Sequence, residues 1–323
     1  MAQAIQIRGV GGPEKLVLID LDLPEIGPAM VRVRIEATGV NFIDVYHRTG
    51  LYPFPLPFTP GVEAAGVVEA VGEGVRDLSS GDRVAWSMVP GAYATHCIAP
   101  ADRLVRVPDG LSTELAAASL LQGMTAHYLT YGVRETRPGD VALVHAAAGG
   151  TGGLLVQMLV QAGARVIATC STEAKAALAR ESGADDVILY TEEDFRARAR
   201  ELTDGRGVDV VYDSVGQSTF DGSLASLRPR GLLCLFGQAS GPVPPFDLGR
   251  LNTSGSIFVT RPSLAHYVAD RASLESRAGA VFSALEKGAL KQRIGGRYAL
   301  ADAAQAHRDL EGRGTTGKLL LVG

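Results

Sequence analysis

The sequence predicts an α/β protein with two domains, one rich in short strands and one built on a doubly wound parallel sheet. The chain has 323 residues, about twice the ~150 residues that serve as a soft prior for one domain. Residues 1–100 read as short strands separated by glycine and proline, whereas residues 141–189 alternate strand and helix. Hydrophobic residues make up 46% of the chain and charged residues 20%, which is typical of a folded globular protein.

The first domain is predicted to contain antiparallel strands and one irregular loop. Residues 52–60 hold prolines at positions 53, 55, 57 and 60, which exclude a helix or a central strand, and we expect this loop to be functional. Ser112 can cap the helix that follows, with Glu114 in its first turn, and this helix runs toward Tyr131. The predicted strands are residues 4–8, 16–20, 31–37, 66–71, 83–86 and 93–98.

From residue 141 onward, strand and helix alternate, which predicts the parallel sheet. After residue 263, two helical patterns and a terminal strand are expected to return to the first domain. We therefore assign residues 1–124 and 264–323 to the β-rich domain and residues 125–263 to the parallel-sheet domain, with a cleft between them as the default ligand site. Strands are predicted at 141–147, 165–170, 185–190, 208–212 and 232–236, with one or two more within 251–260, and helices up to 162 and over 173–182.

Charge and cysteine content narrow the class of protein. The chain carries 31 Lys and Arg against 35 Asp and Glu, a net charge of −4 without a basic stretch, so we expect no nucleic acid as its main partner. Its three cysteines form no CxxC pair, which fits a reduced, cytoplasmic protein. Arg8 and Glu14 interrupt the apolar core that a secretory signal would need. We therefore expect a cytoplasmic protein that acts on small molecules.

Residues 141–164 carry no formal charge and are long enough to cross a bilayer. Several glycines interrupt this run, together with the polar residues His145, Gln157 and Gln161. Such a pattern is typical of a buried strand, a tight turn and a buried helix. We therefore predict no membrane span.

The first strand of the parallel sheet runs into a glycine-rich turn that opens an apolar helix. Ala147, Gly149 and Gly152 occupy the three glycine places of the GxGxxG pattern, and Gly150 and Thr151 lie between them. Glycines at this turn allow positive φ and a close backbone approach, and the helix N-terminus offers free N–H groups to a pyrophosphate. We therefore predict a dinucleotide site here, and the alternative is a turn that binds nothing.

The end of the second parallel strand favours NADPH over NADH. NAD sites usually place Asp or Glu there to hold the ribose 2′-OH, but this chain has Ser171. One helical turn later, Lys175 could meet a 2′-phosphate, Ser171 and Thr172 could add hydroxyl groups, and Tyr190 could reach the same phosphate or cover the adenine. The alternative is that Lys175 is a solvated helix lysine and that Glu173 only favours the helix start.

Six motifs, taken in order, carry a resemblance along nearly the whole chain. They are NFIDVYHRTGLYP at 41–53, PGVEAAGVVEAVGEGV at 60–75, GDRVA at 81–85, AAAGGTGG at 146–153, VVYDSVG at 210–216 and VTRPSL at 259–264. The chain resembles zeta-crystallin-type NADPH:quinone oxidoreductases, zinc-independent members of the medium-chain dehydrogenase/reductase superfamily. The resemblance implies a GroES-like catalytic domain, a Rossmann domain, NADPH as cofactor, and a homodimer joined through the Rossmann sheets.

Zinc is not expected. Zinc-dependent relatives carry a Cys in the segment that here reads Gly-Val-Asn at 39–41, and a Gly-His-Glu triplet where this chain has Gly-Val-Glu at 61–63. The six histidines lie singly, while a zinc site needs about three or four protein ligands. Metal-assisted alcohol oxidation is therefore disfavoured.

By resemblance, Asn41, Tyr46 and Tyr52 line the nicotinamide and acceptor side, where they would donate an amide N–H and two phenol O–H groups. The alternatives are that Asn41 caps a helix over 42–48, that Tyr46 is helix packing and that Tyr52 is a surface aromatic. Asp213 is either a ribose contact or a strand-end cap. The further cofactor residues expected are Thr125, Ser214, Phe236, Gly237, Ser240 and Lys318.

The leading hypothesis is NADPH-dependent reduction of quinones, because an electron-poor quinone needs little beyond binding and hydrogen-bond donors for the developing oxyanion. One alternative is reduction of the activated double bond of alkenals or enones, which uses the same hydride. Another is a non-catalytic protein that binds NADPH as a sensor or structural module.

Overall fold

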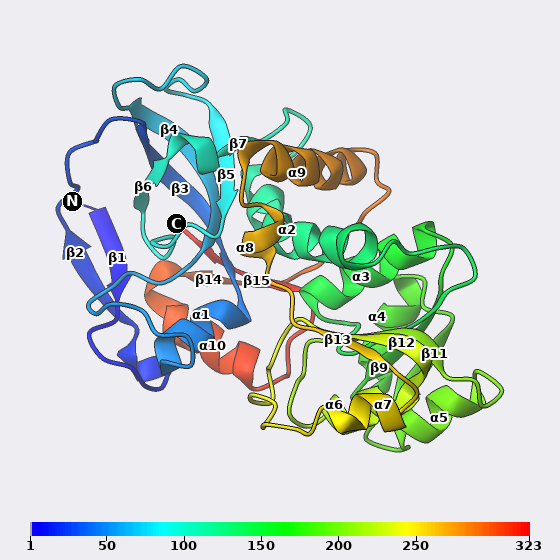
Figure 1. The fold of residues 1–323 in the computed structure, drawn as a ribbon. Coiled ribbons are helices and arrows are strands. Elements are labelled where there is room, and N and C mark those ends of the chain that lie inside the picture. The colour runs from blue at the N-terminus through cyan, green and yellow to red at the C-terminus, as the bar shows by residue number, and fades with distance from the viewer. Residues whose placement is uncertain (1) are drawn as a thin grey trace. The chain divides into compact units, whose positions relative to one another are not determined.

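A computed structural model describes residues 2–323. The chain forms two compact units, one made of residues up to Met124 together with Val268–Gly323, and one of Thr125–Tyr267. The return to the first unit thus comes at Val268, whereas residue 264 was the predicted position. In Figure 1 the blue-to-cyan N-terminal part and the orange-to-red C-terminal part make up the first unit.

The first unit is built on strands, most of them antiparallel. Its larger sheet has seven strands in the order β14-β15-β3-β4-β5-β7, with β6 paired to β3, and β1 and β2 form a second sheet. Among the described strands of the larger sheet, β14 and β15 pair in parallel and all other pairs are antiparallel. The strands are β1 (Ala2–Gln6), β2 (Val17–Leu21), β3 (Met30–Val40), β4 (Glu63–Val71), β5 (Arg83–Ser87), β6 (His96–Pro100), β7 (Val105–Arg106), β14 (Ile294–Ala299) and β15 (Lys318–Val322).

Helices and an irregular loop complete the first unit. Residues 51–62 between α1 and β4 form no helix or strand, as their prolines predict. The helices are α1 (Phe42–Thr49), α9 (Arg271–Glu286), α10 (Ala303–Glu311) and the short 3₁₀ turns η1 (Pro13–Lys15), η2 (Ala101–Arg103) and η4 (Leu300–Asp302).

The long helix α2 (Thr113–Tyr128) carries the chain from the first unit into the second. The Ser112 hydroxyl accepts from the N–H of Leu115 at 3.1 Å, which confirms the predicted cap. After Tyr128 the helix widens into a π-helical turn, η3 (Leu129–Val133).

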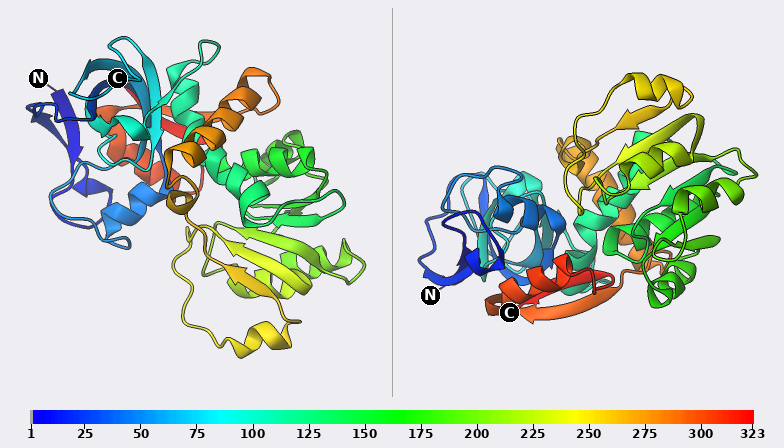
Figure 2. Two further views of the ribbon diagram at one scale, coloured as in Figure 1. Left: turned by 45° about the horizontal axis from the view of Figure 1, so that its top comes forward. Right: turned by 90° about the horizontal axis from the view of Figure 1, so that it is seen from below.

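The second unit is a parallel sheet of six strands in the order β10-β9-β8-β11-β12-β13. This is the doubly wound order, in which the chain starts at a central strand and adds strands first on one side and then on the other. The strands are β8 (Val141–Val144), β9 (Arg165–Cys170), β10 (Asp186–Leu189), β11 (Val208–Asp213), β12 (Leu227–Leu235) and β13 (Phe258–Thr260). Figure 2 shows β13, in yellow-orange, at the edge of the sheet.

Helices connect these strands and cover their apolar residues, among them Leu143, Ile167 and Val211, which are fully buried. The helices are α3 (Gly150–Gln161), α4 (Glu173–Glu181), α5 (Phe195–Glu201), α6 (Phe220–Ser226), α7 (Gly249–Thr253) and α8 (Leu264–Tyr267). The segment 251–260 was expected to add one or two strands, and it holds one, β13, after the end of α7. Asp247 accepts from the N–H of Gly249 at 2.8 Å and starts α7 there, so only β13 remains extended.

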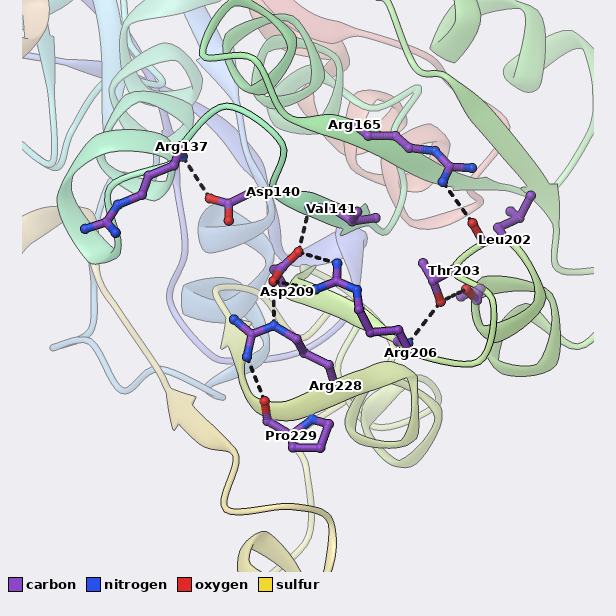
Figure 3. A network of polar contacts seen from close by, with 12 residues as sticks. Arg137, Asp140, Val141, Arg165, Leu202, Thr203, Arg206, Asp209, Arg228 and Pro229 are labelled. Atoms are coloured by element: carbon purple, nitrogen blue, oxygen red, sulfur yellow. Dashed lines mark hydrogen bonds and ion pairs between the residues drawn. The ribbon is translucent and has the colours of Figure 1, made fainter.

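The amino ends of two central strands are joined through Asp209, the second residue of β11 (Figure 3). Its carboxylate accepts from the backbone N–H of Val141 at 2.8 Å, which ties β11 to β8. Arg206 and Arg228 also donate to it, at 2.8 and 2.5 Å. The opposite, carboxyl ends of the same strands carry the candidate site.

Candidate functional site

The turn after β8 has the predicted place in the fold but a different backbone. No glycine between 149 and 153 has positive φ, and Gly149 has φ −76°. The left-handed residue is Ala146, with φ 52°, whose carbonyl accepts from the N–H of Gly149 at 2.9 Å. The expectation that glycines supply positive φ here is therefore wrong, because the chain reverses one residue before the first glycine place.

Gly152 is needed for close packing rather than for its φ. A Cβ atom added there would lie 2.3 Å from the carbonyl oxygen of Ala146 and 2.9 Å from the Cα of Ala147. The turn can therefore fold back onto the first turn of α3 only if residue 152 has no side chain. Gly149, the N-cap residue, makes no side-chain cap, so the first N–H groups of α3 at Gly150 and Thr151 stay available to an anion.

Ser171, Lys175 and Tyr190 lie at the neighbouring ends of β9 and β10. The N–H of Tyr190 donates to the carbonyl of Cys170 at 3.1 Å, and the tyrosine side chain is 45% exposed. Lys175 lies in the first turn of α4, the helix that follows β9. The structure thus brings these three predicted residues to one edge.

Thr172 caps the helix that follows β9, and its part as a hydroxyl donor to a phosphate stays a prediction. Its hydroxyl accepts from the N–H of Lys175 at 3.3 Å and caps α4. Glu173, the first residue of this helix, pairs with Arg180. Thr172 therefore orients the first turn of α4, because its hydroxyl oxygen accepts the hydrogen bond from the N–H of Lys175.

At the end of β11, Asp213 is a strand-end cap. Its buried carboxylate accepts from the N–H groups of Val215 and Gly216 at 2.8 and 3.0 Å, and from the hydroxyls of Thr219 and Ser223. These bonds shape the turn that leads to α6. They favour the capping alternative over a direct ribose contact.

The predicted residues after β11 and β12 lie against each other. A Cβ on Gly237 would meet the carbonyl oxygen of Ser214 at 2.5 Å, so glycine is required for this approach. The N–H of Phe236 donates to the carbonyl of Asp213 at 2.8 Å. The Ser240 hydroxyl donates to the carbonyl of Val215 and accepts from an N–H of the same loop, so it holds the two strand ends together.

Arg261 was missed by sequence reasoning although it lies in one of the motifs that carry the resemblance. It directly follows β13, and its guanidinium donates to the carbonyl of Leu235 at 3.2 Å. Burial raises the pKa of Cys234 to about 12, and the nearby charge of Arg261 opposes the shift. A cation thus stands at the carboxyl edge of β12 and β13, and a count of charged residues at strand ends would have found it.

In the first unit, Asn41 hydrogen-bonds both members of a fully buried ion pair, Glu63 and Lys318. Its Nδ2 donates to Glu63 at 2.9 Å and to the carbonyl of Gly39 at 3.1 Å, and its Oδ1 accepts from the ammonium of Lys318 at 2.6 Å. Lys318 and Glu63 bond each other at 2.5 Å, and both side chains are 0% exposed. Both amide hydrogens of Asn41 are therefore used inside the protein, so the expected amide donation to a ligand is wrong. The geometry favours a positioning part for Lys318 over direct cofactor contact, which stays a prediction.

Asp44 continues this network on the next turn. It accepts from the N–H of Asn41 at 2.8 Å and from the hydroxyl of Tyr93 at 3.1 Å. Tyr93 in turn bonds His307, which lies 3.1 Å from Arg48. Burial raises the pKa of Asp44 to about 7, and burial together with the charge of Arg48 lowers the pKa of His307 to about 3. The start of α1 is thus held by hydrogen bonds between buried side chains.

Tyr46 and Tyr52 lie side by side in the same unit. Their ring centroids are 5.1 Å apart with planes at 63°, and the N–H of Tyr52 donates to the carbonyl of Tyr46 at 3.0 Å. Tyr46 is 8% exposed. Thr125 is also 8% exposed, on α2 at the start of the second unit. The structure brings the two tyrosines together near α1.

Two family models match the chain. The first, described as an alcohol dehydrogenase GroES-like domain, covers residues 27–109, and the second, described as a zinc-binding dehydrogenase, covers residues 150–272. A quinone oxidoreductase of Pseudomonas aeruginosa is 46% identical over 324 residues, covering 100% of both chains. The chain belongs to the quinone oxidoreductase family. With it, the predicted fold class, a GroES-like unit and a Rossmann unit, is confirmed.

Relatives within this quinone oxidoreductase family carry names for different activities. A 2-haloacrylate reductase of Burkholderia is 42% identical and covers 100% of this chain and 99% of its own. A solved mycobacterial protein in complex with NADPH is 49% identical, covers 99% of this chain and 100% of its own, and has a TM-score of 0.96. Both alignments run the full length of the family fold.

Within residues 2–323, no three His, Cys, Asp or Glu side chains gather into a group that could hold a metal ion. Over the same part of the chain, no helix combines the length and the apolar character needed to cross a membrane.

Proposed function

We propose that the chain is an NADPH-dependent quinone reductase that passes hydride or electrons from NADPH to quinones without a metal. The observation that carries this proposal is the full-length identity of 46% to a quinone oxidoreductase, on a chain whose Rossmann edge has Lys175 and no carboxylate at the end of β9. The NADPH complex of the mycobacterial relative supports the same cofactor.

NADPH fits the residues at this edge. The free N–H groups at the start of α3 would receive the pyrophosphate, and Gly152 leaves the turn compact enough for them to point outward. Ser171, Lys175 and Tyr190 would hold the 2′-phosphate, with Lys175 supplying the charge. Bound NADPH supplies the hydride, and the residues of the chain bind and orient it.

On the acceptor side, we propose Asn41, Tyr46 and Tyr52. Lys318 uses one lone pair of the Asn41 Oδ1, and the second can accept a hydrogen bond from a ligand. The paired tyrosine rings offer flat surfaces and hydroxyl donors to a quinone. Hydrogen bonds to the developing oxyanion suffice for this reaction, because solvent can provide the final protons.

Reduction of an activated carbon–carbon double bond is the second candidate. It is favoured by the 42% identity to a 2-haloacrylate reductase over the whole chain. The two reactions share the cofactor edge, so they would differ in the residues that contact the acceptor, chiefly those of the loop 51–62.

The test is the rate of NADPH and NADH oxidation by the purified protein with benzoquinones, naphthoquinones, enones and 2-haloacrylates, with a chelator present throughout. Fast NADPH-linked turnover of quinones that the chelator leaves unchanged is the expected result. Turnover confined to enones or haloacrylates would replace the proposal by the second candidate. NADPH binding without any turnover would favour the sensor alternative.

We also propose a cytoplasmic homodimer joined through the edge of the Rossmann sheet. In the single chain, β13 pairs with β12 alone, and Phe258 on β13 is 62% exposed. The three cysteines are all free and buried, as a reducing compartment allows. Light scattering should give the mass of a dimer for the wild type and of a monomer for Phe258→Lys, and a monomeric wild type would contradict the proposal.

A further inference from the structure

Four buried polar side chains form a hydrogen-bonded set, here called the His145 network, inside the Rossmann unit near the carboxyl ends of its central strands. The Thr169 hydroxyl lies 2.9 Å from Nδ1 of His145, Nε2 of His145 lies 3.0 Å from the Ser223 hydroxyl, and this hydroxyl lies 2.8 Å from Oδ2 of Asp213. None of the four residues is more than 2% exposed. Such a network is costly to bury unless each member has its partner.

The donor and the acceptor of each hydrogen bond in the His145 network can be assigned. The Asp213 carboxylate accepts in all of its bonds, so the single proton of the Ser223 hydroxyl points to it. Ser223 must then accept from His145, which places the proton of the imidazole on Nε2. Burial lowers the pKa of His145, although the charge of Asp213 opposes the shift, so the imidazole is neutral. A neutral ring with its proton on Nε2 has Nδ1 as the acceptor for the Thr169 hydroxyl.

The His145 ring also has a fixed orientation. It packs against the ring of Phe195 with centroids 4.9 Å apart and planes at 88°. The backbone N–H of His145 donates to the carbonyl of Tyr212 at 3.1 Å, which anchors it to β11. The residue is thus held at both ring nitrogens, by the Phe195 ring and at its backbone.

The position of the His145 network links it to the candidate cofactor edge. His145 directly precedes Ala146, the left-handed residue that starts the turn into α3. The carbonyl of Thr169 accepts from the N–H of Ala147 at 3.4 Å, and the carbonyl of Asp213 accepts from the N–H groups of Phe236 and Gly237 at 2.8 and 3.3 Å. The residues of the His145 network therefore contact, through their backbones, the turn after β8 and the end of β12.

We propose that His145 is a positioning residue for the dinucleotide: it locks the turn over residues 146–149 so that the first N–H groups of α3 face the pyrophosphate. This inference rests on the proposed binding of NADPH. His145 touches no cofactor atom itself and acts through the backbone that follows it. Because the pyrophosphate is common to NADPH and NADH, its loss weakens both cofactors equally, whereas Lys175 acts on NADPH alone.

The experiment measures dissociation constants of NADPH and NADH by fluorescence titration, together with KM and kcat, for the wild type, His145→Ala and His145→Gln. His145→Ala should raise both dissociation constants about tenfold, the equivalent of one buried hydrogen bond to the turn, and keep their ratio. The KM for NADPH should rise, while kcat at saturating NADPH stays within about twofold. His145→Gln keeps a donor toward Ser223 and should recover most of the affinity.

Asp209→Asn is the matched control. It breaks a network at the amino end of β11, whereas the turn after β8 lies at the carboxyl ends of the strands. It should lower the melting temperature and leave both dissociation constants unchanged. If His145→Ala also lowers only the melting temperature and keeps both constants within about twofold, the inference is overturned.

If His145→Ala does not fold, Thr169→Val and Ser223→Ala each remove one hydroxyl from the His145 network and keep the imidazole. Both should weaken NADPH and NADH by the same factor, and unchanged constants in both variants would overturn the inference as well. A wild type that binds neither cofactor would overturn the proposed function and the inference together. Tight binding by the wild type with unchanged variants would remove the inference alone.

Discussion

Strand β11 carries an aspartate near each end, and the two are satisfied in opposite ways. At the amino end, Asp209 meets two guanidinium groups, Arg206 and Arg228, whose side chains are 49% and 27% exposed (Figure 3). At the carboxyl end, Asp213 is fully buried, and its carboxylate accepts hydrogen bonds from hydroxyls and backbone N–H groups. One end of the strand is held by full charges and the other by dipoles.

The difference shows what each end must permit. Although burial raises the pKa of Asp209, the hydrogen bonds of its two arginines outweigh this and bring it to about 2. Such ion pairs hold the sheet where no phosphate is proposed to bind. At the carboxyl edge, neutral donors shape the turns and add no fixed cation, so Lys175 and Arg261 decide the charge that a phosphate meets there. The two ends can be tested separately.

The largest effect is expected for Asp213→Ala. It leaves two backbone N–H groups and two hydroxyls without their acceptor in a buried place. The free energy of unfolding should fall by about 3 kcal/mol or more, measured by urea denaturation and circular dichroism. Asp213→Asn keeps one acceptor oxygen and should lose about half as much. A loss below about 1 kcal/mol for the alanine variant would mean that water replaces the carboxylate.

Next in size is the acid sensitivity supplied by Asp209. Its pKa in the folded state, about 2, lies below the value of 3.8 for a free side chain, so ionisation stabilises the fold above about pH 4 and this contribution is lost as the pH falls toward 2. Asp209→Asn should therefore cost about 2 kcal/mol at pH 7. Urea denaturation at several pH values should show the wild type and the variant converging near pH 2. A constant difference between them would argue against the ion pairs as the cause.

A change of about 1.4 kcal/mol is expected at the one lysine assigned to the 2′-phosphate. Lys175→Ala should raise the dissociation constant for NADPH about tenfold and leave that for NADH unchanged, since only NADPH carries the phosphate. Fluorescence titration gives both constants. Lys287→Ala, an exposed lysine at the end of α9, serves as the matched control. Equal losses for both cofactors would remove Lys175 from the phosphate site.

The smallest effect concerns salt. Because the arginines around Asp209 are partly exposed, about 1 M NaCl should reduce the cost of Asp209→Asn by up to about 1 kcal/mol. The cost of Asp213→Asn should not change, since its donors carry no charge. Urea denaturation at low and high salt measures both differences. A similar salt response of the two variants would erase the distinction between the ends.

Local pattern was enough to predict much of the Rossmann unit. The strand, turn and helix around Gly149 and Gly152 follow from spacing, because both glycines act on neighbouring backbone. The cap at Ser112 is likewise a contact between residues three apart. The positive φ of Ala146 was not predictable, because nothing in an alanine marks it and the conformation is set by the packing of the turn.

The sequence could not predict side-chain hydrogen bonds whose partner lies far along the chain. Lys318 and Glu63 are 255 positions apart, and neither the expected contact of Lys318 with the cofactor nor the donating amide of Asn41 takes their pairing into account. Thr172 and Asp213 each had a local capping motif, but a residue type alone does not decide between a cap and a ligand contact. Satisfaction of buried polar atoms decides it, and this needs the fold.

The buried pair of Glu63 and Lys318 also restricts how this sequence can change through evolution. Replacing either residue alone strands a charge in the interior, at a cost of about 3–5 kcal/mol. Replacing both by apolar residues restores packing but leaves the Asn41 amide without two of its partners. The three positions must therefore drift together or stay as they are, and homologues should divide into those that keep the whole set and those that lost it.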